Sequence, residues 1–248
     1  MKVVVIGGTG LIGSKVVALL GEHGHEAVAA SPNTGVNTLT REGLAGALQG
    51  ASVVVDVSNS PSFEDQAVID FFRASTTNLL VAEAEAGVAH HVALSVVGTD
   101  RLQGSGYFRA KQVQEDLIKE SGTPYSIVHA TQFFEFGKGL ADGMTVGDTV
   151  RVPAARIQPM ASEDVAAAVA RAAVGSAVDG VVEVGGPEVF QLDEFLRMAL
   201  AAHNDPRSVV TDPSTTYWGA ELQDSTLLPG PDAHVGKVAF ADWLSRQR

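Results

Sequence analysis

The stretch that decides the fold is Met1-Lys-Val-Val-Val-Ile-Gly-Gly-Thr-Gly-Leu-Ile-Gly13. Val3 to Ile6 form a β-branched run that is too short for a helix and stops at two glycines. An apolar-periodic segment, Leu11 to Leu20, follows without a helix breaker inside it. This order of features predicts a strand, a tight turn and a helix.

The turn carries the spacing of a dinucleotide-binding fingerprint. Gly8, Gly10 and Gly13 match G-x-G-x-x-G, in which early glycines allow a sharp turn and close approach of backbone to a pyrophosphate. The last glycine lets the helix lie against the strand, and the helix N-terminus offers free N–H groups to phosphates. The plainer alternative is a glycine-rich βα turn without a ligand, which the flanking strand and helix disfavour. We therefore expect cofactor contacts from Gly7, Thr9, Gly10, Leu11, Ile12 and Gly13.

The same turn, Gly7-Gly-Thr-Gly-Leu-Ile-Gly13, resembles the opening of the atypical and extended short-chain dehydrogenase/reductases, especially the NmrA-like group. The resemblance covers most of the chain and is most specific over residues 1–165. It implies an α/β fold with a Rossmann-type, doubly wound parallel sheet and a small C-terminal substrate-binding lobe. It also implies that the protein binds NAD(P) and that hydride comes from this cofactor.

Length and composition limit the class of protein. The 248 residues suffice for one α/β domain with substrate-side elements at about 132–160 and 187–248, but not for two full domains. A net charge of −12 repels phosphate backbones, so we expect neither nucleic-acid nor membrane partners. The absence of cysteine excludes disulfides, thiolate catalysis and cysteine-ligated metals. We expect a cytoplasmic protein without a metal site, and we leave homo-oligomerisation open.

Strand-like and helix-like segments alternate along the chain, which predicts right-handed crossovers and a parallel sheet. The adjacent His90 and His91 are interpreted as surface or edge residues that do not share a metal. Ser162 is the expected N-cap of a helix that runs to Val174. The other expected strands are 26–30, 53–57, 92–95, 124–129, 149–152, 157–160 and, as the last one, 180–184; the other expected helices are 41–48, 64–73, 76–86, 107–121, 193–203 and 238–244.

The end of the second strand bears on the choice between NAD and NADP. An NAD-selective fold places Asp or Glu there to hold the ribose 2′-hydroxyl, but this chain has Ser31-Pro-Asn-Thr34. Ser31, Asn33 and Thr34 are neutral hydrogen-bonding groups, which favours NADP, although NAD binding and a loop indifferent to the phosphate stay open. The nearest arginine is Arg41. By resemblance, the loop after the third strand passes the adenine and its ribose, through Ser58, Asn59 and Ser60.

Tyr107 and Lys111 stand four residues apart at the start of a predicted helix, on one of its faces. Reduction of a carbonyl leaves an alkoxide that needs a proton, and an ammonium near a phenol lowers the phenol's pKa towards neutrality. The pair matches Tyr-x-x-x-Lys of the short-chain dehydrogenases, in which the lysine also holds the nicotinamide ribose. Ser95 is expected to hydrogen-bond the substrate oxygen, although it lies only 12 residues before Tyr107, a short spacing for extended members. The alternatives are an aromatic anchor for Tyr107 and a solvated helix lysine for Lys111.

The remaining candidates lie near the nicotinamide and substrate. Thr131 and Gln132 follow the fifth strand and are expected to face the cofactor, while His129 and Ala130 replace the family's Arg-Pro pair. His129 is interpreted as structural, with a proton shuttle as the alternative. Residues 204–235 lack periodicity and are interpreted as a substrate-side lid, with disorder as the alternative. The expected substrate contacts are Val96, Val97, Phe133, Phe134, Tyr217 and Trp218, although the phenylalanines suit a core equally well.

These features together predict an NAD(P)H-dependent oxidoreductase, with NADPH favoured, that reduces a carbonyl or quinone-like small molecule. Tyr107 is the expected acid and Lys111 its support. The main alternative is a non-catalytic, NADP-binding redox sensor of the NmrA type. An epimerase or a reductase of a conjugated C=C bond would keep the cofactor and change the reaction.

Overall fold

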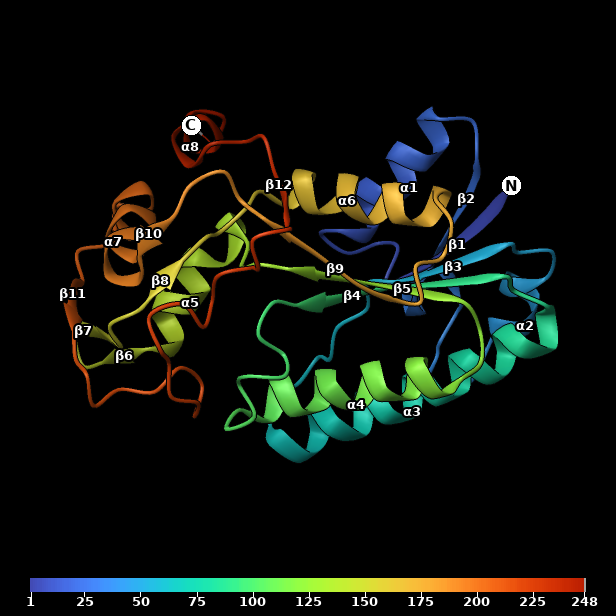
Figure 1. The fold of residues 1–248 in the computed structure, drawn as a ribbon, viewed down its shortest axis with the longest axis horizontal. Helices are drawn as coiled ribbons and strands as arrows, with labels where there is room; N and C mark the ends of the chain where they lie inside the picture. Colours follow the sequence, from blue (N-terminus) through green and yellow to red (C-terminus); the bar gives the residue numbers. More distant parts are fainter. Residues whose placement is uncertain (248) are drawn as a thin grey trace.

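A seven-stranded, fully parallel sheet forms the centre of the computed structural model, which describes residues 1–247 (Figure 1). Its strand order is β12-β9-β5-β4-β3-β1-β2. The predicted parallel sheet is therefore confirmed. The strands are β1 (Lys2–Ile6), β2 (Glu26–Ala30), β3 (Val53–Asp56), β4 (His90–Val96), β5 (Tyr125–Ala130), β9 (Gly180–Gly185) and β12 (His234–Val235).

Helices cover both faces of the sheet (Figure 1). Val3 and Val5 of β1 pack beneath α1 (Gly13–Glu22) and α6 (Ser162–Val174). Val4 and Ile6 point to the other face, which α2 (Leu44–Leu48), α3 (Asp65–Ala86) and α4 (Gly106–Glu120) cover. Because successive residues of a strand face opposite sides, a strand buried on both sides reads as a continuous apolar run.

The strand order reverses at β1, which lies between β2 and β3. The chain runs outward from β1 to β2 and then crosses back to β3, so the loops after β1 and β3 meet at the carboxyl edge of the sheet. A Cβ atom on Gly7 would lie 2.9 Å from the backbone of Ser58. Open α/β sheets bind ligands in the crevice at such a switch point.

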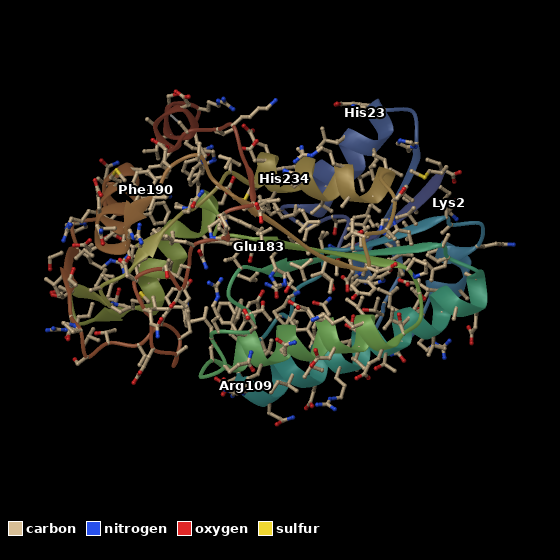
Figure 2. All side chains as sticks on the ribbon, in the orientation of Figure 1. Lys2, His23, Arg109, Glu183, Phe190 and His234 are labelled. Atoms are coloured by element: carbon tan, nitrogen blue, oxygen red, sulfur yellow. The ribbon has the colours of Figure 1, made fainter. Side chains whose placement is uncertain are left out.

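A smaller lobe lies beyond the carboxyl edge of the sheet (Figure 1). Figure 2 shows Glu183 at the end of the sheet near this lobe and Lys2 at the far end. Phe134, Phe195 and Phe240 belong to the lobe's core, which is separate from the clusters beneath the sheet. The lobe contains α5 (Gly137–Gly143), α7 (Leu192–Ala202), α8 (Phe240–Ser245), the strands β6 (Thr145–Val146), β7 (Thr149–Val152) and β11 (Ser208–Thr211), and the pair β8 (Arg156–Ile157) and β10 (Phe190–Gln191).

Several predicted boundaries differ from the structure. The two helices predicted at 64–73 and 76–86 form the single helix α3. Ser75 does not interrupt it, because its hydroxyl donates a hydrogen bond to Thr38 Oγ1 at 2.7 Å and stays buried. Ser162 is the first helical residue of α6 and Ala161 the N-cap, since the Ser162 N–H and hydroxyl both bond the carboxylate of Glu135. The strand at 180–184 is not the last, because β11 and β12 follow within the segment predicted to be irregular.

The interpretation of His90 and His91 as surface or edge residues is wrong. Both are buried at the start of β4. His90 Nε2 lies 2.9 Å from Ser126 Oγ, and His91 Nδ1 lies 2.8 Å from Glu83 Oε1 of α3. Burial alone lowers the pKa of His91, but the charge and hydrogen bond of Glu83 outweigh it and raise this pKa above its usual value. No helix within residues 1–247 has the length and apolar character needed to cross a membrane.

Candidate functional site

The glycine turn between β1 and α1 is held in shape by close backbone contacts. Gly7 has a φ of 77°, which favours glycine. A Cβ atom on Gly8 would lie 2.7 Å from Cα of Ala29, and one on Gly13 would collide with the carbonyl oxygen of Gly7. Gly10 is different, because its Cβ would meet only Gly7 O, at 3.3 Å, and the residue is exposed. Gly7, Gly8 and Gly13 therefore require glycine for the fold, whereas Gly10 leaves room for a ligand.

The start of α1 presents backbone donors to this turn. Among residues 1–247, the N–H groups of Leu11 and Ile12 make no hydrogen bond to the protein backbone. No acidic side chain occupies the first turn of the helix. Unpaired N–H groups at a helix N-terminus suit an anionic group such as a pyrophosphate. The turn thus fits the nucleotide that the sequence predicts.

The end of β2 is tied to the turn through hydroxyl groups. Thr9 Oγ1 donates a hydrogen bond to Ser31 Oγ at 3.0 Å, and the Ser31 N–H donates to Thr34 Oγ1 at 2.9 Å. Asn33 is exposed. Arg41 forms an ion pair with Glu85 at 3.2 Å. Because Glu85 lies in the last turn of α3, just before β4 begins, this arginine is at the opposite edge of the sheet from the turn.

Sequence reasoning missed Asp56, which organises the loop after β3. This buried carboxylate accepts hydrogen bonds from the Ser58 N–H at 2.9 Å and the Ser58 hydroxyl at 2.6 Å. Its other oxygen accepts a hydrogen bond from Gln114 Nε2 at 2.9 Å. Asn59 Oδ1 accepts from the Ser60 N–H at 3.0 Å. The apolar run 53–57 hid Asp56, since an acidic residue inside such a run carries no periodic signal.

Lys111 points from α4 into the space between the helices and the sheet. Its side chain is buried, and Nζ donates hydrogen bonds to Leu94 O at 2.8 Å and to Gln114 Oε1. Nζ also lies 4.5 Å from the centroid of the Phe72 ring. Burial lowers the pKa of this ammonium to about 8, against the opposing charges of Asp56 and Glu115. Because an ammonium has three donors, one N–H of Lys111 is left after these two bonds.

Tyr107 lies at the first turn of α4 among other aromatic rings. Its ring centroid is 5.8 Å from that of Phe63 and 5.7 Å from that of Phe108. Burial raises the pKa of its phenol to about 12. Among the described residues, the hydrogen bonds of Lys111 go to Leu94 O and Gln114 Oε1 and not to the Tyr107 hydroxyl, so the support of Tyr107 by Lys111 stays a prediction.

Ser95 belongs to a buried network that sequence reasoning also missed. Its hydroxyl donates a hydrogen bond to Glu115 Oε1 at 2.6 Å, and His129 Nε2 lies 2.8 Å from the same oxygen. Burial raises the pKa of Glu115, but the bonds from His129 and Ser95 and the charge of Lys119 reverse this and hold it at about 2. The hydroxyl proton of Ser95 is thus committed to a carboxylate. The bond of Ser95 to a substrate oxygen stays a prediction.

The end of β5 carries buried polar groups. Among the described residues, Thr131 Oγ1 is buried and makes no hydrogen bond, while the Gln132 amide is buried beside Tyr217, where it opposes the rise in the pKa of that phenol that burial causes. Unsatisfied buried groups of this kind are rare in native structures and indicate a missing water, ion or ligand. The segment predicted to face the nicotinamide and substrate therefore has a buried polar group that a ligand could bond.

Part of the 204–235 segment folds over the β4–α4 loop. A Cβ on Gly104 would lie 2.7 Å from Gly219 O, and one on Gly98 would lie 3.0 Å from Thr226 O. This contact brings Tyr217, which is 4% exposed, to a ring-centroid distance of 6.4 Å from Phe108, next in sequence to Tyr107.

The other predicted substrate residues are dispersed. Val97 and Phe134 lie in the core, 0% and 2% exposed. Phe133 stacks on Phe136 with centroids 5.3 Å apart. Trp218 is 48% exposed, and its ring lies against Gly143 of α5. Val96 is partly buried.

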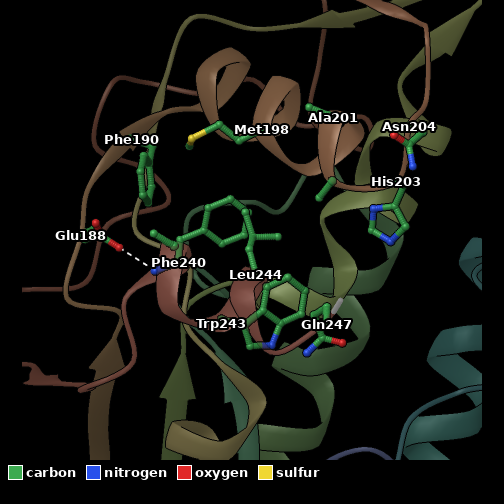
Figure 3. Close-up of a pocket in the computed structure, with 12 residues that line it drawn as sticks. Glu188, Phe190, Met198, Ala201, His203, Asn204, Phe240, Trp243, Leu244 and Gln247 are labelled. Atoms are coloured by element: carbon green, nitrogen blue, oxygen red, sulfur yellow. Dashed lines mark hydrogen bonds between the residues drawn. The ribbon is translucent and has the colours of Figure 1, made fainter.

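A cavity of about 790 Å³ lies within the lobe, between α7 and α8 (Figure 3). Phe190, Met198 and Leu244 line it, and its Glu188 carboxylate accepts a hydrogen bond from the Phe240 N–H at 2.7 Å. None of the predicted cofactor or substrate residues lines this cavity.

Comparison with known proteins identifies the fold. No family model and no curated protein matches the chain. Solved structures do match over nearly the whole length. The fold is of the Rossmann type. An NADPH-dependent quinone oxidoreductase (QOR2) from Escherichia coli is 15% identical, with a TM-score of 0.68 and 99% of each chain covered.

Two other similar structures are nucleotide-sugar proteins. A UDP-N-acetylglucosamine 4-epimerase from Bacillus cereus is 16% identical, with a TM-score of 0.70, and the match covers 100% of this chain and 96% of that one. MoeE5 in complex with UDP-glucuronic acid and NAD is 17% identical, with a TM-score of 0.73 and coverage of 99% and 97%. At these identities the similarity concerns the fold.

Proposed function

We propose that the protein is an NAD(P)H-dependent oxidoreductase, with NADPH preferred, that reduces a carbonyl or quinone-like small molecule by hydride transfer. The observation that carries the proposal is the glycine turn at the switch point of the sheet, where the N–H groups of Leu11 and Ile12 have no backbone partner within residues 1–247. The similar structures include an NADPH-dependent quinone oxidoreductase and an NAD complex, which supports this proposal.

Different residues at the carboxyl edge of the sheet bind different parts of the nicotinamide nucleotide. The turn and the start of α1 hold the pyrophosphate, and Thr131 supplies a hydroxyl that has no partner in the described protein. Lys111 offers its remaining N–H to the nicotinamide ribose. The neutral groups Ser31 and Asn33 leave the end of β2 free of the acidic side chain that would repel a 2′-phosphate. A bound nicotinamide nucleotide supplies the hydride.

Tyr107 is the proposed proton donor. With its pKa raised to about 12 by burial, the phenol stays protonated at neutral pH. An alkoxide is a stronger base than a phenolate, so transfer of the Tyr107 proton to a reduced carbonyl oxygen is favourable. The same high pKa leaves almost no phenolate at neutral pH, so little Tyr107 is in the form that could take up a proton in the reverse reaction.

The oxidation of NADPH, followed by its absorbance against a panel of ketones, aldehydes and quinones, tests the proposal. Tyr107→Phe should abolish carbonyl turnover and leave the affinity for NADPH within about twofold, because it removes a proton donor and keeps the ring. Tyr125→Phe is the matched control, since Tyr125 starts β5 at the other edge of the sheet. Full activity of Tyr107→Phe would refute the assignment of the acid.

One observation favours the redox sensor as the second candidate. The Ser95 hydroxyl donates to Glu115, and Lys111 Nζ donates to Leu94 O and Gln114 Oε1, so among the described residues no hydrogen bond links the three predicted catalytic groups to one another. A sensor needs the nucleotide site without a proton donor. Tight binding of NADPH in calorimetry with no turnover on any compound of the panel would select this alternative.

A further inference from the structure

Gln114 lies on the buried face of α4, between a carboxylate and an ammonium. The residue is 1% exposed. Its Nε2 donates a hydrogen bond to Asp56 Oδ2 at 2.9 Å, and its Oε1 accepts one from Lys111 Nζ. Because a carboxylate only accepts and an ammonium only donates, these two partners fix which way the amide is turned.

The two bonds of this amide join two parts of the predicted nucleotide site. On one side, Asp56 Oδ1 accepts hydrogen bonds from the Ser58 N–H at 2.9 Å and the Ser58 hydroxyl at 2.6 Å. Ser58 belongs to the loop that is predicted to pass the adenine ribose. On the other side, Lys111 is the residue proposed to hold the nicotinamide ribose. A continuous series of hydrogen bonds therefore runs from Ser58 through Asp56 and Gln114 to Lys111.

The amide also stands between Lys111 and a direct bond to Asp56. Within the described chain, the hydrogen bonds of Lys111 Nζ go to the amide oxygen and to Leu94 O of β4, and Nζ lies 4.5 Å from the ring centroid of Phe72 in α3. The charged groups that act on this ammonium are Asp56 of β3 and Glu115 of α4. A lysine has a flexible four-carbon stem, so without the amide its ammonium is free to turn towards Asp56.

We propose that Gln114 is a positioning residue, which holds Lys111 in place for the nicotinamide ribose and links it to the loop after β3. The inference rests on the proposed function, because Lys111 acts there on a bound nucleotide. A side chain of the same length without an amide removes the acceptor of Lys111 and one donor of Asp56. The two bonds from Ser58 to Asp56 do not involve the amide, so the adenine side of the site should keep its shape.

Two ligands separate the two sides of the site. Calorimetry measures the binding of NADPH and of adenosine 2′,5′-bisphosphate, which carries the adenine and the 2′-phosphate but lacks the nicotinamide ribose. Gln114→Met keeps the length of the side chain and removes the amide. Gln114→Glu keeps an acceptor for Lys111, and its acid form can still donate to Asp56. Gln112→Met is the control on the same helix, because the Gln112 amide bonds Asp116 at the exposed surface.

We expect Gln114→Met to bind NADPH about 10- to 100-fold more weakly than the native protein, the range for one hydrogen bond from a charged group. Its affinity for the bisphosphate should stay within about twofold of the native value. Gln114→Glu should recover NADPH binding to within about threefold, and Gln112→Met should bind both ligands as the native protein does.

The pH dependence separates a positioning role from a loss of structure. Burial lowers the pKa of Lys111 to about 8, so the affinity of the native protein for NADPH should fall above pH 8 as the ammonium loses its proton. Gln112→Met should show the same fall. In Gln114→Met the ammonium no longer bonds the ribose, so its weaker NADPH binding should stay level between pH 7 and pH 10.

An equal loss of affinity for both ligands in Gln114→Met would show a general structural role and overturn the inference. An NADPH pH profile of Gln114→Met that runs parallel to the native one would do the same. If the native protein does not bind NADPH, the proposed function fails and this inference with it, whereas native NADPH binding that Gln114→Met leaves unchanged removes the inference alone.

Discussion

Replacement of Lys111 by methionine tests how the structure buries this ammonium. Its side chain is 2% exposed, lies over Phe72 and donates hydrogen bonds to Leu94 O and Gln114 Oε1. Burial lowers its pKa from 10.5 to about 8. The unfolded chain therefore binds more protons than the folded chain between these two pH values, and the free energy of unfolding of the native protein rises with pH across that window.

The size of the effect follows from the shift. At about 1.4 kcal/mol per pKa unit, the native protein gains about 3 kcal/mol of unfolding free energy between pH 8 and pH 10.5. Below pH 8 the ammonium is charged in both states, so the whole cost of burying it is present. Lys111→Met removes that cost and two hydrogen bonds worth about 1 kcal/mol each, so at pH 7 it should be about 1 kcal/mol more stable than the native protein.

Urea unfolding at pH 7, 8.5 and 10 measures both predictions. The difference between native protein and Lys111→Met isolates this lysine, because other groups titrate equally in both proteins. At pH 10 the native protein should have overtaken the variant. Lys138→Met is the control, since Lys138 forms an exposed pair with Asp142, and its curve should run parallel to the native one within about 0.5 kcal/mol. Parallel curves for Lys111→Met and native protein would refute the buried-ammonium argument.

Two further predictions concern the turn and the buried carboxylate. Gly13→Ala should lose at least about 2 kcal/mol of stability together with NADPH binding, because the new Cβ collides with backbone atoms. Gly10→Ala should melt near the native temperature and only weaken NADPH binding. Thermal melts and calorimetry measure both effects, and a native-like melt of Gly13→Ala would contradict the argument. The pKa of Glu115 lies at about 2, below its usual 4.5, so the native protein should lose about 3 kcal/mol as the pH falls from 5 to 2, and Glu115→Gln should not. Urea unfolding at pH 7, 5 and 3 tests this, because about 2 kcal/mol of the loss falls between pH 5 and 3, and equal acid sensitivity of the two proteins would exclude Glu115 as the cause.

Local patterns in the chain predicted the central architecture. The β-branched run before Gly7 and the periodic residues after Gly13 predicted β1, the turn and α1, which the structure confirms. Alternation of strand and helix signals predicted a parallel sheet, which it also confirms. These features were readable because each depends on neighbours in sequence: backbone conformation at glycine, side-chain alternation in strands and helical periodicity. The placement of Tyr107 and Lys111 in one helix followed from the same periodicity.

The sequence by itself thus determined the glycine turn between β1 and α1 and the class of fold, and the tertiary structure decided which side chains meet. Strand order and register bring His129 beside Ser95 and place Glu115 over both, so the hydroxyl predicted for the substrate bonds a carboxylate. Only the folding of a late segment over the β4–α4 loop places Tyr217 near Gln132. No local pattern specifies such pairs, because contacts between distant residues depend on how whole elements pack.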